Sequence, residues 1–224
     1  MASSPSPSTS TSITDTDTDT TSISSPSPSP KAPLLTIPLE LRLEIYSYLL
    51  SLPPYYKYEY RPSHVHPNLL LANRQINWEA TPLLYASNTF LAHPTLLASF
   101  PRLRAWYMPI RVESVVPRIR RFHIQVQLDC DVPYDRRDVA RAFSGIDELT
   151  IDLVQSMFMG SGYTNLRRFE AVRGVHRVTI LGSTTGFDEY IAWLQKAMTS
   201  DPGAAIDDFH PLHPNWADHL TLAC

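Results

Sequence analysis

The sequence lacks the features that would tie it to a membrane or to an oxidising compartment. Its only cysteines, Cys130 and Cys224, lie far apart in a chain of 224 residues, and two such thiols do not form a disulfide framework. No apolar run approaches the roughly 18 residues that a membrane-spanning helix needs. The first residues contain neither the basic nor the apolar region of a secretion signal. We therefore expect an intracellular protein, cytoplasmic or nuclear, with both thiols free.

Catalytic and cofactor-binding patterns are missing as well. The chain has no P-loop, no Gly-x-Gly-x-x-Gly after an expected strand and no Gly-x-Ser-x-Gly turn. Three histidines gather near the C-terminus, but prolines interrupt them, so their spacing fits no compact metal site. These residues are His210, His213 and His219, with Pro211 and Pro214 among them. We therefore expect a protein without enzymatic activity, metal or cofactor.

The chain also lacks an excess of positive charge. Its formal net charge is −3, and the first 30 residues hold three aspartates and no base. Removing these three leaves 19 acidic against 19 basic residues, so the rest of the chain is neutral, which argues against nucleic acid held by bulk charge. The one basic concentration runs from Arg102 to Arg121, with Trp106 and Tyr107 in it. Arginines mixed with rings are typical of single-stranded nucleic-acid platforms, so this role ranks third among the possible functions.

Residues 1–33 are nearly all serine, threonine, proline and aspartate. Such a segment cannot bury enough apolar surface to offset the entropy of ordering it, so we expect a disordered tail. Five Ser-Pro steps are either sites for proline-directed phosphorylation or part of a solvated spacer. They lie at Ser4, Ser6, Ser25, Ser27 and Ser29.

Residues 66–90 carry one apolar stripe at helical spacing. We expect Pro82 to interrupt this helix and to start a second, short one capped by Thr81. Asn88 should end the helical pattern before a strand. The only comparable apolar helix nearby covers residues 37–52. The stripe consists of Leu69, Ala72, Ile76, Ala80, Leu83 and Leu84.

The helix expected at residues 37–52 is apolar around most of its circumference, so it must be covered from two sides. Residues 69–84 explain one side. The other is covered either by the rest of the domain or by a partner protein. One stripe contains Leu41, Ile45, Leu49 and Leu52, and the other contains Leu39, Leu43, Tyr46 and Leu50.

These two segments resemble the fungal F-box-like protein family. Ile37-Pro38 followed by Glu40-Leu41 is similar to the F-box opening Leu-Pro-x-Glu-Leu. The second half of the family pattern is matched at Arg74-Gln75-Ile76, Glu79-Ala80, Pro82-Leu83-Leu84-Tyr85 and Asn88-Thr89-Phe90. Residues 51–66, rich in proline and tyrosine, look like an insertion between the first two F-box helices.

The resemblance implies that this module docks on the Skp-type linker subunit of a cullin–RING ubiquitin ligase of the SCF type. The candidate contact residues for that subunit are Pro38, Leu41, Ile45 and Leu49. Arg74 and Glu79 also belong to the family pattern, and their spacing prevents an ideal pair within one helix. We expect Arg74 to bond loop carbonyls and Glu79 to bond nearby amides or Arg42.

Three later segments share one apolar pattern, at residues 119–124, 146–151 and 175–180. Their offsets of 27 and 29 residues suit the Leu-x-x-Leu-x-Leu core of an irregular leucine-rich repeat. The register places one set of side chains in a core and the next set on the other face. The inward set is Phe122, Leu149 and Val178, with Ile124, Ile151 and Ile180 beside them. The outward set is His123, Thr150 and Thr179.

Each of these strands is followed by an expected helix, at residues 133–143, 157–172 and 186–199. Strand–helix–strand units imply parallel neighbours in one sheet. We also expect a short helix at residues 94–100. Cys130 should be a buried, inert thiol beside the first strand.

These expectations define an α+β protein whose F-box-like helices precede irregular leucine-rich-repeat-like βα units. The expected parts are a tail (residues 1–33), a helical module (34–90), a βα-repeat domain (91–200) and a flexible C-terminal tail (201–224). The expected function is a non-enzymatic protein-interaction adaptor for an unknown target. The main alternative is an F-box-like scaffold with no ubiquitin-ligase link.

Overall fold

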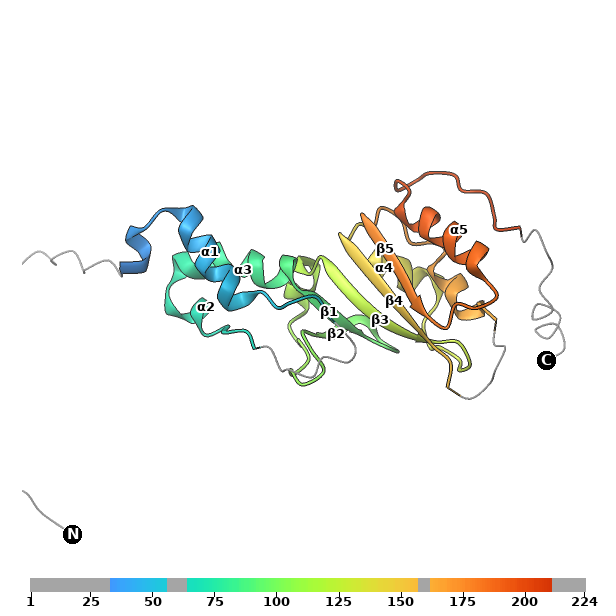
Figure 1. Cartoon of the computed structure of the whole chain (residues 1–224), viewed down its shortest axis with the longest axis horizontal. Helices are drawn as coiled ribbons and strands as arrows, with labels where there is room; N and C mark the ends of the chain where they lie inside the picture. The colour runs from blue at the N-terminus through green and yellow to red at the C-terminus, as the bar shows by residue number, and fades with distance from the viewer. Residues whose placement is uncertain (1–32, 56–63, 157–161, 211–224) are drawn as a thin grey trace, which may run out of the picture. The chain divides into compact units, whose positions relative to one another are not determined.

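The computed structural model describes residues 33–55, 64–156 and 162–210 (Figure 1). Apart from Pro33, the tail predicted to be disordered lies outside the described residues, as does most of the predicted C-terminal tail. Residues 38–224 form one compact unit and residues 1–37 another. The only described element of the first unit is a short 3-10 helix, η1 (Pro33–Thr36). Everything below concerns the second unit.

The centre of this unit is a five-stranded mixed sheet with the order β2-β1-β3-β4-β5. Strands β1, β3, β4 and β5 run parallel, and β2 is antiparallel to β1. Together with the helices described below, this sheet agrees with the predicted α+β class. The strands are β1 (Thr89–His93), β2 (Leu97–Arg102), β3 (Arg121–Gln127), β4 (Glu148–Val154) and β5 (Arg177–Gly182).

The register predicted for the three repeated segments is confirmed. Leu149 of β4 lies opposite Phe122 of β3 on one side and Val178 of β5 on the other. Phe122 and Leu149 are buried, and Val178 packs against the same core. Thr150 pairs in the same way with His123 and Thr179, and all three are only half-buried. Side chains therefore alternate between the core and the opposite face, as the period of two requires.

Two of the three predicted covering helices are present, as α4 (Arg136–Phe143) and α5 (Asp188–Thr199). Phe143 of α4 packs edge-on against Phe122, with ring centroids 5.5 Å apart. The predicted helix at residues 157–172 is wrong, because its described part holds only a short 3-10 helix, η3 (Thr164–Phe169). The Asn165 side chain donates hydrogen bonds to the carbonyls of Gln127, the last residue of β3, and of Cys130 in the following loop, each at 2.7 Å.

The N-terminal half of the unit contains α1 (Leu39–Leu50), α2 (Leu69–Ala72) and α3 (Arg74–Ser87). The predicted break at Pro82 is wrong, since α3 runs through it. The Thr81 hydroxyl does not cap a new helix but donates to the carbonyl of Asn77 one turn back, at 2.6 Å. The break instead falls at Asn73, whose backbone is extended. The Asn73 side chain caps α3 by accepting a hydrogen bond from the Gln75 N–H at 2.7 Å.

The join between these helices and the sheet is direct. Asn88 is 1% exposed and bonds three backbone groups. Its amide donates to the carbonyls of Leu50 at 2.7 Å and Leu84 at 2.8 Å, and its oxygen accepts from the Leu52 N–H at 2.7 Å. Strand β1 begins at the next residue, so the boundary predicted between residues 90 and 91 falls inside a strand. Leu84 also belongs to the same buried cluster as the sheet.

The helix predicted at residues 94–100 is absent, and the chain there turns into β2. The His93 ring nitrogen Nδ1 accepts hydrogen bonds from the N–H groups of Thr95 and Leu96, at 3.2 and 3.3 Å, and so stabilises the turn. Leu97 and Phe100 have φ values of 53° and 54°, which a right-handed helix cannot accommodate. Residues between β2 and β3 contain one further 3-10 helix, η2 (Glu113–Arg118).

Candidate interaction surfaces

Helix α1 divides its apolar residues between an inner and an outer face. Arg42, Tyr46 and Leu50 recur every four residues and are buried. Leu41 and Ile45 point the other way, with exposed fractions of 51% and 38%. The outer face of α1 is completed by the exposed Pro38 and Tyr48 and the half-buried Leu49. All four residues predicted to contact the linker subunit therefore belong to this face.

An ion pair holds the inner face of α1 on α3. The guanidinium of Arg42 donates two hydrogen bonds to the carboxylate of Glu79, from Nη2 at 2.6 Å and from Nε at 2.9 Å. The Tyr46 hydroxyl and the Gln75 amide donate to the same carboxylate, at 3.1 and 2.8 Å. The predicted Arg42–Glu79 contact is thus confirmed. Arg74 is exposed, and among the described residues the predicted bonds from its side chain to loop carbonyls are not found.

This arrangement strongly favours the ionised form of Glu79. Hydrogen bonding from Arg42 lowers the pKa of the carboxyl to about 2, against the opposing effect of burial. Hydrogen bonds from Gln75 and Tyr46 add to the lowering. Burial, and then the hydrogen bond to the ionised Glu79, raises the pKa of the Tyr46 hydroxyl. The tyrosine therefore stays neutral and remains a donor to the carboxylate.

The ion pair predicts an acid sensitivity of the fold. A carboxyl whose pKa is lower in the folded than in the unfolded state stabilises the fold above its unfolded pKa and loses this effect as the pH falls. For Glu79 the loss should occur between about pH 4.5 and pH 2. We expect the difference in free energy of unfolding between wild type and Glu79→Gln to shrink over this range, as measured by urea denaturation at several pH values.

The matched control is Glu40→Gln, because Glu40 is an exposed carboxyl on α1, the helix to which Glu79 is bonded through Arg42. It should differ little from wild type at any of these pH values. If the difference in free energy of unfolding between wild type and Glu79→Gln stays constant down to pH 2, the assigned role of Glu79 is contradicted.

The second candidate surface lies on the sheet, opposite the face covered by α4 and α5. It is polar and carries the outward-facing set of the predicted register. We call this surface the open sheet face. It contains Arg121, His123, Gln125, Glu148, Thr150, Asp152, Arg177 and Thr179. Because α4 and α5 contribute to the buried core on the other side, neither helix covers this face.

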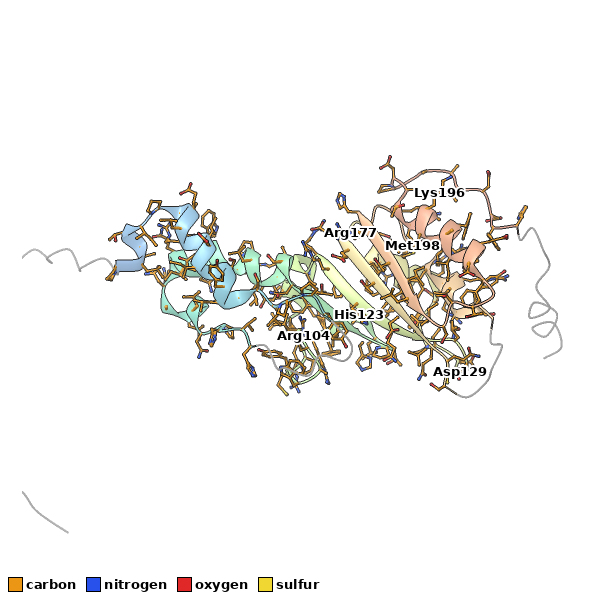
Figure 2. The ribbon with its side chains drawn as sticks, viewed as in Figure 1. Arg104, His123, Asp129, Arg177, Lys196 and Met198 are labelled. Atoms are coloured by element: carbon orange, nitrogen blue, oxygen red, sulfur yellow. The ribbon has the colours of Figure 1, made fainter. Side chains whose placement is uncertain are left out.

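One end of the open sheet face is shaped by the segment that follows α1. The Tyr55 ring packs edge-on against His123, with centroids 4.6 Å apart, and the Arg104 guanidinium lies 5.4 Å from the Tyr55 centroid. Figure 2 labels Arg104 and His123. A cavity of about 330 Å³ opens here, with Arg102 and Asp152 also in its lining. The tyrosines at 56, 58 and 60, predicted to form a loop or an edge, lie outside the described residues.

The basic residues between Arg102 and Arg121 do not form one exposed cluster. Arg104 is 1% exposed and donates to the carbonyls of Pro53 at 2.6 Å and Leu103 at 2.9 Å. Arg120 binds Asp147 at 2.7 Å. The Tyr107 hydroxyl accepts from the Val65 N–H at 3.0 Å. Several members of the sequence cluster thus stabilise the fold, and no sequence signal marked Arg104 as a buried residue.

The remaining sequence candidates are not brought together. Cys130 is exposed, which corrects the expectation of a buried thiol, because it lies in the loop after β3 rather than in the strand. Within the described part of the chain, no three histidine, cysteine or acidic residues are grouped as metal ligands. His213, His219 and Cys224 lie outside the described residues.

Comparison of the chain with protein-family models, with curated proteins and with solved structures finds no match. In the ranges that the structure describes, no helix is long and apolar enough to cross a membrane.

Proposed function

We propose that this chain is a non-enzymatic protein-interaction adaptor whose outer α1 face binds the Skp-type linker subunit of a cullin–RING ubiquitin ligase. The observation that carries the proposal is the exposure of Leu41 and Ile45 at the segment that resembles the F-box opening. A row of exposed apolar side chains on one helix is a feature of interaction sites. Tyr48, which is 78% exposed, adds an amphipathic ring of the kind enriched at interfaces.

We further propose that β3, β4 and β5 are irregular leucine-rich-repeat-like units and that the open sheet face holds the target protein. Support comes from the matching register of the three strands and from their polar outward-facing row. Arg121, Glu148 and Arg177 alternate in charge across this row, and such charges give specificity more than affinity. The adaptor requires no chemistry of its own, because bridging two partners raises their effective concentration.

The linker-subunit proposal predicts loss of binding on truncation of the outer α1 face. Changing Leu41→Ala and Ile45→Ala together should weaken retention of purified linker subunit at least tenfold in a pull-down. Truncated anchor residues at the centre of an interface commonly cost more than 1 kcal/mol each. Both side chains are substantially exposed, so the variant should keep the circular dichroism spectrum and thermal midpoint of the wild type.

The matched control is Leu181→Ala, which truncates a leucine that is 49% exposed at the other end of the unit, on β5. It should bind as the wild type does. Wild-type protein that fails to retain the linker subunit would favour the alternative, an F-box-like scaffold with no ligase link. If the variant with both Leu41→Ala and Ile45→Ala still retains the linker subunit, the interface does not lie on the outer face of α1.

A further inference from the structure

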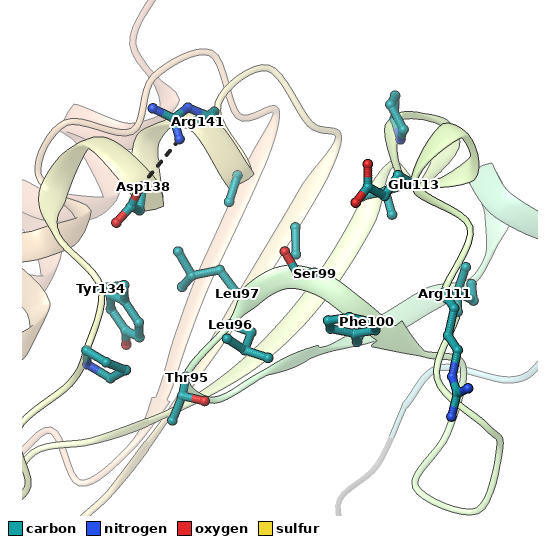
Figure 3. Close-up of a pocket in the computed structure, with 16 residues that line it drawn as sticks. Thr95, Leu96, Leu97, Ser99, Phe100, Arg111, Glu113, Tyr134, Asp138 and Arg141 are labelled. Atoms are coloured by element: carbon teal, nitrogen blue, oxygen red, sulfur yellow. Dashed lines mark ion pairs between the residues drawn. The ribbon is translucent and has the colours of Figure 1, made fainter.

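A second cavity lies between strand β2 and helix α4, and it shares Phe100 with the cavity of about 330 Å³ at the end of the open sheet face. It has a volume of about 610 Å³ (Figure 3). Its lining comes from β2 and the turn before it, from η2 and the loop before that, and from α4 with the segment leading into it. The volume lies within the range of about 300–1,000 Å³ that is typical of sites for small molecules.

The walls of this cavity are mainly apolar, and the charged groups around it balance. Leu96, Leu97, Phe100, Ile110 and Val116 supply much of the lining. The charged lining residues are two arginines and two acids, and one of each forms an ion pair in which Arg141 and Asp138 lie 3.5 Å apart. Apolar walls with no net charge favour a neutral, largely apolar ligand.

Among the described residues that line the cavity, Tyr134 alone has a buried side-chain polar atom without a hydrogen-bond partner. The residue is 4% exposed, and its hydroxyl forms no hydrogen bond within the described part of the chain. In Figure 3 this hydroxyl lies toward the Thr95 end of the cavity. Burial raises the pKa of Tyr134 to about 12, so the hydroxyl keeps its proton and can donate. An unpaired buried polar group is costly, and an acceptor in the cavity would remove that cost.

Strand addition along β2 is a less suitable use of this region. Pro101 lies within the strand and has no N–H to donate, and its carbonyl already accepts from the Ile110 N–H at 2.8 Å. Leu97 and Phe100 are the described non-glycine residues with left-handed backbones, and such residues do not continue a regular ladder. A compact molecule in the cavity avoids these obstacles, whereas an extended peptide does not.

We propose that the cavity between β2 and α4 binds a neutral small molecule with an apolar body and one hydrogen-bond-accepting oxygen. The apolar body contacts Leu97 and Phe100, and the oxygen accepts from the Tyr134 hydroxyl. This site is independent of the adaptor role, because neither the outer face of α1 nor the open sheet face contributes to its lining.

The test uses two ring compounds of similar size, acetophenone with a carbonyl oxygen and ethylbenzene without one. Each is titrated into the full chain while chemical shifts are followed by NMR. Both should bind saturably. Tyr134→Phe should weaken acetophenone binding by roughly two- to tenfold, the usual effect of one hydrogen bond, and leave ethylbenzene binding unchanged. Ala142→Phe, which places a ring in the cavity from α4, should weaken both.

The Tyr134→Phe comparison decides the matter even if Ala142→Phe fails to fold, because it removes only one buried oxygen. Absence of saturable binding by both compounds would overturn the proposal. An equal effect of Tyr134→Phe on the two compounds would overturn the assigned hydrogen bond, and binding that a folded Ala142→Phe variant leaves intact would overturn the location.

Discussion

Replacing Leu149 with alanine is expected to lower the free energy of unfolding by about 2–5 kcal/mol. Leu149 is fully buried on β4, between Phe122 of β3 and Val178 of β5. Alanine removes apolar contacts and leaves a cavity that the neighbouring strands cannot close. Urea denaturation followed by circular dichroism measures the change.

Thr150→Ala is the matched control, because Thr150 is the next residue on the same strand and faces the open sheet face. It should cost less than about 1 kcal/mol. Equal and small changes in the free energy of unfolding at the two positions would mean that the Leu149 side of β4 does not face the core. The register of the three repeated strands would then be wrong.

A second large effect is expected for Asn88→Ala. This change leaves the Leu52 N–H and the carbonyls of Leu50 and Leu84 without their side-chain partner. Each buried group left unpaired costs about 1–3 kcal/mol, so the total should exceed about 2 kcal/mol. Thermal and urea unfolding of purified protein measure the loss.

Two further variants test the role of Asn88, one as a neutral control and one as a second destabilising change. Asn68→Ala changes an exposed asparagine just before α2 and should leave the unfolding midpoint almost unchanged. Asn88→Asp keeps an oxygen acceptor but removes both amide donor bonds, so it should also be destabilising. Stability retained in both Asn88 variants would show that the three backbone groups find other partners.

The parts of the fold that follow from local periodicity could be predicted from the sequence. Strands alternate with a period of two, and the same pattern recurs in β3, β4 and β5, so the register of Phe122, Leu149 and Val178 could be deduced. Arg42 was one of two partners expected for Glu79, the other being nearby amides, and the structure shows the bond to Arg42. In these places one physical requirement dominates the choice of residue.

Other features depend on contacts between distant residues and could not be predicted. Helix α1 is apolar nearly all round, so the sequence could not tell that Tyr46 points inward and Tyr48 outward. Pro82 is usually a helix breaker, yet packing keeps α3 continuous through it. The four candidate contact residues on α1 came from the family pattern, and their exposure comes from the structure.

The cavity at Tyr134 is a further example of this limit. Nothing in the local sequence distinguishes a buried tyrosine with a partner from one without. The cavity exists because β2, η2 and α4, with the loops next to them, enclose a space without filling it, and this depends on three distant segments at once.

The position of Asn88 has a consequence for how the chain can be divided. Its hydrogen bonds join the ends of α1 and α3 to the start of β1 without any linker. A fragment ending at residue 90 would keep only two residues of β1, lose their pairing with β3 and expose Phe90, which is 1% exposed in the intact fold. The helices are therefore not an autonomous folding unit, and they should melt in the same cooperative transition as the sheet.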